Sequence, residues 1–263
     1  MINYKKYISV VILVFYATFS FGQKKNGYES KLFVSHLDTL KYQVLMPKNF
    51  DATKQYPVVL FLHGAGERGN DNEMQLVHGS KLFASAENQN SFPAIVVFPQ
   101  CPKNDYWASV KIDRTSKPIT LEFPLDAEPT KPMELVIDLM VDLISKPYVN
   151  KHKVYVGGMS MGGMGTFEIL QRKPEMFAAA IAICGAGNPD TVKTYAKSTP
   201  LWVFHGAKDD VINPQESINM VSGILKYGGK PNFTLYAQDN HNSWDSAFAE
   251  HDLLAWLFSN IKN

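Results

Sequence analysis

The chain has 263 residues, 45% of them apolar, and a formal net charge of +1. Such a length suits one α/β domain or two small ones with a sizeable core. The balanced charge argues against a nucleic-acid or anionic-membrane protein, which would carry a clustered basic face.

The N-terminus has the pattern of a secretory signal peptide. Two lysines precede an apolar run over 8–21, and the small residues Ser20 and Gly22 stand at the minus-three and minus-one positions of a cleavage site. The run is shorter than the ~20 residues that span a bilayer, which disfavours the alternative of an uncleaved anchor. We therefore predict a signal peptide over 1–22, a catalytic domain over 23–263, and a secreted or periplasmic location.

Two apolar stretches, 31–35 and 40–46, predict an opening antiparallel pair of strands. The next stretch, 58–62, is apolar on both faces and suits a central parallel strand covered by helices.

Residues 64–69 then spell G-x-G-x-x-G, which raises the alternative of a dinucleotide-binding loop. That loop needs a helix opening within the glycines, yet more loop follows here, and Glu67 would place a carboxylate beside the phosphates. We expect no cofactor.

A helix is predicted over 73–86 and a buried strand over 94–98. The segment 99–131 contains repeated prolines and is expected to be irregular. Long loops inside a domain tend to be functional, so this insertion is a candidate lid or specificity segment. The alternative is a surface excursion that covers the sheet edge.

Strands and helices alternate in the remainder of the chain. Strands are expected at 154–156, 178–184, 201–204 and 233–237, and helices at 133–144, 160–173, 214–227 and 246–261. This alternation predicts an α/β fold, a mostly parallel eight-stranded sheet with helices on both faces.

The stretch from Gly158 to Gly162 reads G-x-S-x-G around Ser160, directly after a predicted strand and before a helix. This is the form of a nucleophile elbow, in which a strained turn exposes the serine above the sheet. Alone it is a weak signal, because chance produces it in roughly one chain of this length in ten.

A serine nucleophile needs a histidine base and an acid that orients it, in the chain order serine, acid, histidine. Of the histidines after Ser160, His241 is the best base, because it follows the last strand at the rim above the elbow. His205 is expected to bond backbone at a strand end, and His251 to lie on a helix surface.

Asp209 and Asp210 both follow a strand end, and residue type alone leaves either as the acid. The oxyanion hole needs two backbone donors. We expect the N–H of Met161, directly after the nucleophile, and the N–H of Ala65, in the glycine-rich loop.

Five motifs stand in the order H-G-A-G-E-R-G-N-D, P-Q-C-P with Trp107, G-M-S-M-G-G, H-G-A-K-D-D-V and H-N-S-W-D. Together the chain resembles the secreted bacterial carboxylesterases of the α/β-hydrolase superfamily, in the phospholipase/carboxylesterase, feruloyl-esterase and polyhydroxybutyrate-depolymerase-like group. The resemblance covers about 31–261. It implies an α/β-hydrolase fold, Asp209 rather than Asp210 as the acid, no metal or organic cofactor, and a strand order of 1-2-4-3-5-6-7-8.

That implied order separates Cys101 from Cys184 by three strand steps, about 14 Å, which exceeds the ~7 Å limit for a disulfide. Two free, buried thiols are therefore expected.

Three aromatic residues near the rim, Tyr106, Trp107 and Trp244, are candidates for substrate contact, with Trp244 equally suited to packing on the triad as scaffold.

The leading hypothesis is a secreted serine esterase acting on small-molecule or polysaccharide-linked esters, such as feruloyl or acetyl esters, with neither a nucleic-acid partner nor a stable membrane anchor. The alternatives are a peptidase of the prolyl-oligopeptidase type and a secreted binding protein with a vestigial site.

Overall fold

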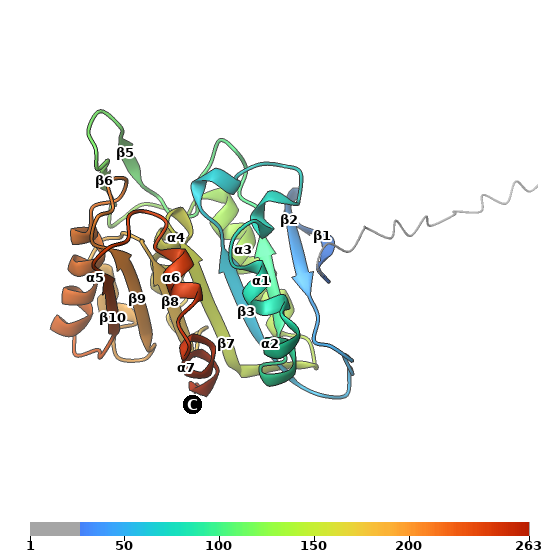
Figure 1. Ribbon diagram of the computed structural model, residues 1–263. Helices are drawn as coiled ribbons and strands as arrows, with labels where there is room; N and C mark the ends of the chain where they lie inside the picture. Colours follow the sequence, from blue (N-terminus) through green and yellow to red (C-terminus); the bar gives the residue numbers. More distant parts are fainter. Residues whose placement is uncertain (1–26, 263) are drawn as a thin grey trace, which may run out of the picture.

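A computed structural model describes residues 27–262 of the chain. Its centre is an eight-stranded sheet of order β1-β2-β4-β3-β7-β8-β9-β10 (Figure 1). All neighbouring pairs from β4 to β10 are parallel, whereas β1 pairs with β2 and β2 with β4 in antiparallel fashion. The strands of this sheet, in chain order, are β1 (Glu29–Ser35), β2 (Asp38–Leu45), β3 (Tyr56–Leu62), β4 (Ile95–Pro99), β7 (Val149–Met159), β8 (Ala179–Ile183), β9 (Leu201–Gly206) and β10 (Asn232–Tyr236).

The α/β fold and the strand order agree with the sequence prediction once the small hairpin strands β5 and β6 are set aside. Strands β3, β4 and β8 are almost wholly buried, as expected for parallel strands with helices on both sides.

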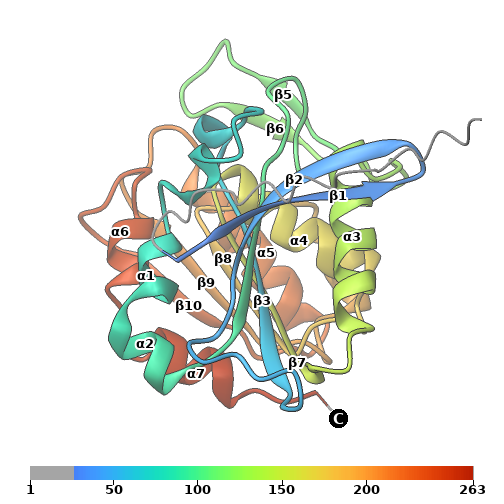
Figure 2. The ribbon, with the colours of Figure 1, turned by 90° about the vertical axis from the view of Figure 1, so that its right-hand side faces the viewer.

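Helices cover both faces of the sheet (Figure 2). One face carries α3, α4 and α5, and the other carries α1, α2, α6 and α7, each face with its own buried apolar cluster. The helices span Lys131–Ile144, Met161–Arg172 and Pro214–Lys226 on the first face, and Ser80–Ala84, Ala86–Ser91, Trp244–Phe248 and Leu253–Ser259 on the second. Three 3₁₀ turns, η1, η2 and η3, lie at Ala65–Glu67, Met74–Leu76 and Thr191–Thr194.

The helix predicted over 73–86 is wrong as a single element. Gly79 adopts a φ of +77°, which an L side chain rarely allows. A Cβ at this position would also lie only 3.1 Å from the Phe61 ring. Ser85 then leaves the helical conformation and its hydroxyl caps α2. The segment therefore forms η2, α1 and α2 in place of one continuous helix.

The terminal helix predicted over 246–261 is also divided, into α6 and α7. His251 lies in the turn between them and not on a helix, and its side chain is fully exposed. The turn allows aromatic residues of both short helices to pack on the same sheet face, among them Phe248, Trp256 and Phe258.

The insertion 99–131 is not wholly irregular, because it contains an antiparallel hairpin of β5, Lys111–Asp113, and β6, Thr120–Glu122. The hairpin projects beyond the carboxyl ends of the parallel strands, the end of the sheet at which β7 turns into α4 (Figures 1 and 2). The Ile119 N–H donates to the Val211 carbonyl at 3.0 Å, and Asn188 donates to the Phe123 carbonyl at 3.0 Å. These bonds tie the insertion to the loops that follow β8 and β9.

Both cysteines are free and buried, as predicted. The predicted signal peptide lies outside the described residues. Within residues 27–262, no helix combines the length and the apolar character needed to cross a membrane.

The turn from β7 to α4 brings three backbones into contact. Ser160 has φ 53° and ψ −118°, a left-handed backbone that costs a non-glycine residue of order 1–3 kcal/mol. A Cβ on Gly158 would lie 2.2 Å from the Gly162 oxygen, and one on Gly162 would lie 1.9 Å from the Leu62 oxygen. Only glycine fits at either position, because the obstructing atoms are backbone.

Replacing Gly162 by Ala should lower the free energy of unfolding by about 3 kcal/mol or more, because β3 and α4 would have to separate. Gly66→Ala is the matched control, since its Cβ would meet nothing within 4 Å and should change stability by about 0.5 kcal/mol or less. Urea unfolding followed by circular dichroism measures both. Equal effects of the two substitutions would contradict this account of the turn.

Candidate active site

The carboxyl ends of the parallel strands bring Ser160, Asp209 and His241 together. Ser160 follows β7, Asp209 lies three residues after β9, and His241 lies in the loop after β10. Ser160 Oγ is 2.9 Å from His241 Nε2, and His241 Nδ1 is 2.8 Å from Asp209 Oδ2. The three residues singled out in the sequence therefore form one hydrogen-bonded chain.

Asp209 is held by more than the histidine. Its Oδ1 accepts the backbone N–H groups of Val211 at 2.8 Å and Ile212 at 2.9 Å, and its side chain is fully buried. Burial by itself would raise the pKa of Asp209, but hydrogen bonds from His205 and His241 outweigh it and hold that pKa well below its usual range. Asp210 is exposed, so the geometry distinguishes the two aspartates that residue type left open.

The ionised Asp209 accepts only, so His241 Nδ1 must carry the proton that lies between them. The lone pair of Nε2 then faces the Ser160 hydroxyl, which is the arrangement a general base needs. His241, oriented by Asp209, can therefore accept the Ser160 proton as the hydroxyl attacks an electrophilic carbon.

The two expected oxyanion donors, Ala65 and Met161, lie with Ser160 on the wall of one pocket. Met161 opens α4, where backbone N–H groups have no partner within the helix. Ala65 opens η1, three residues after the end of β3.

His63, which the sequence analysis did not single out, fixes the loop that carries Ala65. Its Nδ1 donates to the Gly64 carbonyl at 2.7 Å, and its Nε2 accepts the Cys101 N–H at 3.0 Å. The Gly64 carbonyl belongs to the same peptide unit as the Ala65 N–H, so the imidazole sets the direction of that donor. The only sequence signal was its position directly between an apolar strand and the glycine loop.

His63 should make the protein less stable in mild acid. Burial lowers the pKa of His63 to about 4 from its ordinary 6.5, although its bond to Gly64 opposes the shift. Between these two pH values the unfolded chain takes up a proton that the folded chain refuses, so stability falls as the pH falls, by about 3 kcal/mol in total.

Urea unfolding of the wild type and of His63→Gln across pH 6.5 to 4 measures this contribution. The variant should be less stable at pH 6.5 and should lose less stability on acidification. Parallel curves for the two proteins would show that His63 does not cause the acid sensitivity.

The pocket around Ser160 has a volume of about 230 Å³. We call it the Ser160 pocket. Its lining includes the Ser160 loop, the glycine loop, the insertion and the loop after β9: Gly64, Ala65, Gly66, Glu67, Tyr106, Ile112, Arg114, Ile119, Met159, Ser160, Met161, Met164, Val211, Ile212, His241 and Trp244. The insertion thus supplies one wall of the site.

Two arginines act on Tyr106 at this wall. Arg114 donates to the Tyr106 hydroxyl at 3.1 Å, and the guanidinium carbon of Arg68 lies 4.5 Å from the centre of its ring. Partial burial raises the pKa of Tyr106, but the Arg114 hydrogen bond and the two positive charges outweigh that and lower it. Sequence reasoning missed Arg114, Ile112 and Ile119, because no periodic pattern shows where an irregular insertion folds back.

The structure does not place Trp107, a sequence candidate for substrate contact, in the Ser160 pocket. Trp107 has no exposed surface, its indole N–H donates to the His63 carbonyl at 3.1 Å, and its ring packs edge-on against His63. It is a core residue that supports the glycine loop. Trp244 lines the pocket and also packs edge-on against His241, with ring centres 5.5 Å apart.

His205 lies at the end of β9 and bonds the Ile212 carbonyl, as the strand-end prediction requires. It also reaches Asp209 Oδ2 at 3.1 Å, a contact that the sequence did not indicate.

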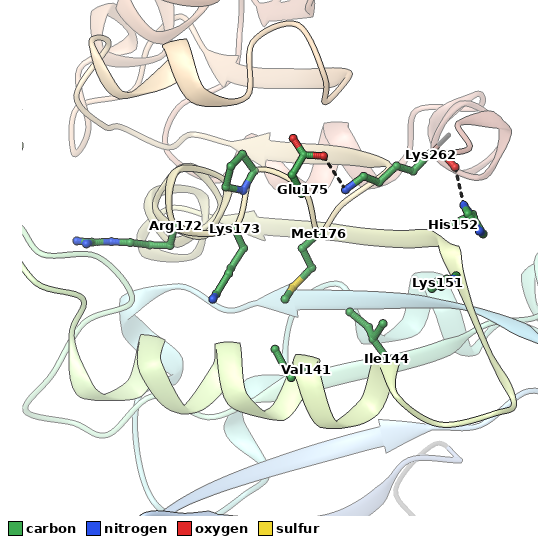
Figure 3. Close-up of a pocket in the computed structure, with 10 residues that line it drawn as sticks. Val141, Ile144, Lys151, His152, Arg172, Lys173, Glu175, Met176 and Lys262 are labelled. Atoms are coloured by element: carbon green, nitrogen blue, oxygen red, sulfur yellow. Dashed lines mark hydrogen bonds and ion pairs between the residues drawn. The ribbon is translucent and has the colours of Figure 1, made fainter.

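A larger cavity of about 530 Å³ lies elsewhere, between α3, α4 and the start of β7 (Figure 3). Its lining combines apolar residues such as Val141 and Met176 with basic ones such as Lys173 and Lys262. Lys262 pairs with Glu175 at 3.3 Å. The cavity contains none of Ser160, Asp209 and His241, so size alone does not mark the reactive site.

Ligand atoms of Cys184, Asp209 and His241 lie within 4.8 Å of one another, which invites comparison with a metal site. Burial raises the pKa of Cys184, and the neighbouring Asp209 raises it further, so a thiolate ligand is disfavoured. Both ring nitrogens of His241 already have hydrogen-bond partners. The contacts fit a proton-transfer chain better than a metal centre.

A family described as "Putative esterase" matches residues 37–255. Among solved structures, a thermostable esterase is 32% identical with a TM-score of 0.80, over 90% of this chain and 64% of that one. A ferulic acid esterase is 18% identical with a TM-score of 0.65, over 88% of this chain and 98% of that one, which shows a shared fold.

Among curated proteins, a bifunctional acetylxylan esterase/xylanase of Neocallimastix patriciarum is 32% identical over 102 residues. That match spans 38% of this chain and 14% of the relative.

Proposed function

The chain belongs to this esterase family, and on that premise we propose that it is a secreted serine carboxylesterase that cleaves its substrate through an acyl-enzyme on Ser160. The observation that carries the proposal is the continuous hydrogen-bonded chain from Ser160 through His241 to the buried Asp209. The N-terminal signal pattern supports export.

In the first half-reaction, Ser160 Oγ attacks the ester carbonyl carbon as its proton passes to His241 Nε2. The negative charge that develops on the carbonyl oxygen is stabilised by the N–H groups of Ala65 and Met161. His241 then returns the proton to the departing alkoxide, and the acyl group stays on Ser160.

In the second half-reaction, water attacks the acyl carbon while His241 accepts a proton from it. The proton then moves to Ser160 Oγ as the C–O bond breaks, which releases the carboxylic acid and restores the free serine. Asp209 stays ionised and stabilises the imidazolium formed in each half-reaction.

We assign the acyl group to the Ser160 pocket, with the insertion 99–131 as its specificity wall. A volume of about 230 Å³ lies below the ~300–1,000 Å³ usual for sites of drug-sized ligands, so it favours a short or flat acyl group. Acetyl and feruloyl groups fit this description, and Tyr106 and Trp244 offer ring surfaces to an aromatic acyl group. The printed names of two similar proteins refer to acetylxylan and ferulic acid. A polysaccharide-linked alcohol would extend into solvent.

Replacing Ser160 by Ala should lower hydrolysis of p-nitrophenyl acetate by about four orders of magnitude or more, because it removes the hydroxyl that faces His241 Nε2. A fluorophosphonate probe should label the wild type and leave this variant unlabelled. Full esterase activity in the variant would refute the proposal, as would cleavage of a peptide p-nitroanilide by a wild type that is inert toward esters.

Asp209→Asn should lower kcat by about 10³ to 10⁴-fold, because the amide no longer fixes the His241 tautomer. Asp210→Asn is the matched control, since that carboxylate is exposed and should stay within about twofold of the wild type. Steady-state kinetics on p-nitrophenyl acetate compares the two, and a larger loss in the Asp210 variant would reverse the assignment of the acid.

Shortening Ile119 to Ala should raise kcat/KM for p-nitrophenyl octanoate relative to acetate by about tenfold, because it enlarges the wall of the pocket. Leu121→Ala provides the control, since Leu121 lies on the same hairpin and does not line the Ser160 pocket. A panel of p-nitrophenyl esters measures the ratios. Equal ratios in both variants would place the acyl group elsewhere.

A further inference from the structure

His205 contacts the catalytic acid from outside the Ser160 pocket. It lies at the end of β9, has no exposed surface, and its Nε2 is 3.1 Å from Asp209 Oδ2. His241 Nδ1 approaches the same oxygen at 2.8 Å. One buried carboxylate oxygen is thus shared by two histidines.

The hydrogen-bond partners of His205 Nε2 require a proton on that nitrogen. That atom faces two acceptors, Asp209 Oδ2 and the Ile212 carbonyl, each at 3.1 Å. Neither oxygen can donate, so Nε2 must carry the proton.

The other ring nitrogen faces Ser217 on α5. His205 Nδ1 is 2.8 Å from Ser217 Oγ, which in turn donates to the Gly185 carbonyl at 2.9 Å. A hydroxyl has one proton, so if it goes to Gly185 then Nδ1 must donate to Oγ. The alternative, a neutral ring that accepts from Ser217, would deprive the Gly185 carbonyl of that donor. Every partner is satisfied when both nitrogens are protonated.

The buried Asp209 charge favours the same state. An ionised carboxylate inside a protein is stable only when it is paired and hydrogen-bonded. Within residues 27–262, the ion pairs of Asp209 are those with His205 and His241. His241 must be neutral at rest to accept the Ser160 proton, which leaves His205 to balance the charge.

We propose that His205 is a positioning residue for the reaction, held as an imidazolium between Asp209 and Ser217, so that Asp209 is fixed and charge-balanced while His241 stays neutral. The inference rests on the proposed function, in which Asp209 orients His241. It extends the hydrogen-bonded chain to Ser160, His241, Asp209, His205 and Ser217.

Two other titratable groups lie near this pair of charges. Glu216, next to Ser217 on α5, has a pKa raised by burial, which the nearby His205 counteracts. Cys184, directly after β8, is kept as a neutral thiol because burial and the adjacent Asp209 raise its pKa. Neither group supplies a positive charge, so both leave the balancing role with His205.

The direct test is nitrogen NMR of the full-length protein labelled with ¹⁵N-histidine at neutral pH. The His205 signals are assigned by their loss in His205→Gln. We expect both ring nitrogens of His205 to be protonated, each with a slowly exchanging low-field proton. One unprotonated ring nitrogen would overturn the proposal, and this result does not depend on activity.

The kinetic test separates charge from mere packing. His205→Gln keeps an N–H near Asp209 without the charge, and Ser217→Ala removes the acceptor for the Nδ1 proton while leaving Nε2 in place. In both variants the acidic limb of the kcat/KM profile should move up by about one pH unit, because losing a nearby positive charge makes His241 easier to protonate.

His251→Gln is the control, because that histidine is exposed in the α6–α7 turn and should leave the profile unchanged. An unshifted acidic limb in both His205→Gln and Ser217→Ala, with normal stability, would reduce His205 to a packing role. Should His205→Gln fail to fold, Ser217→Ala decides the kinetic question, and the ring signals that this variant displaces identify His205, which bonds Ser217, in the wild-type NMR spectrum. If Ser160→Ala kept full activity, the proposed function would fail while the NMR result still tested the charge on His205.

Discussion

The close contact of three backbones, at the ends of β3 and β7 and the start of α4, is the constraint on which the rest of the site depends. Gly158, Gly162 and the Leu62 carbonyl approach so closely that a single Cβ at either glycine would overlap backbone atoms. Ser160, between these two glycines, has the left-handed conformation, and α4 begins at the next residue. The strain is local, and it is tolerated because both strands are buried where they approach the turn.

The second requirement is electrostatic. A carboxylate with no exposed surface stays ionised here because two backbone N–H groups and two imidazoles surround it. Since only one of those imidazoles can take the serine proton, the two histidines have different tasks, although they contact the same oxygen. The hydrogen-bond partners of the ring nitrogens distinguish the two. His241 Nε2 faces the Ser160 hydroxyl, whereas His205 is bonded on both sides, to Asp209 and to Ser217.

The sheet and the turn after β7 bring Ser160, Asp209 and His241 together, whereas the insertion lines one side of the pocket beside them. Its hairpin is bonded to the loops after β8 and β9, so it forms a fixed wall of the pocket. His63 and Trp107 perform a related task from below the glycine loop, since both are buried and bond its backbone. The candidate catalytic residues Ser160, Asp209 and His241 all lie in turns and loops that follow strands of the main sheet, whereas part of the wall beside them comes from the insertion.

Periodic apolar runs and glycine spacing are local signals, and they were enough to predict the α/β fold, the eight strands of the main sheet, and Ser160 and His241 as candidates, but not the hairpin strands β5 and β6. Resemblance added the strand order and the preference for Asp209. The three-dimensional contacts were needed to show that Gly79 divides a helix, that Trp107 is a core residue, and that His63, Arg114 and His205 bond residues of the site. These features depend on contacts between residues far apart in the chain, and such contacts leave no periodicity within any one segment.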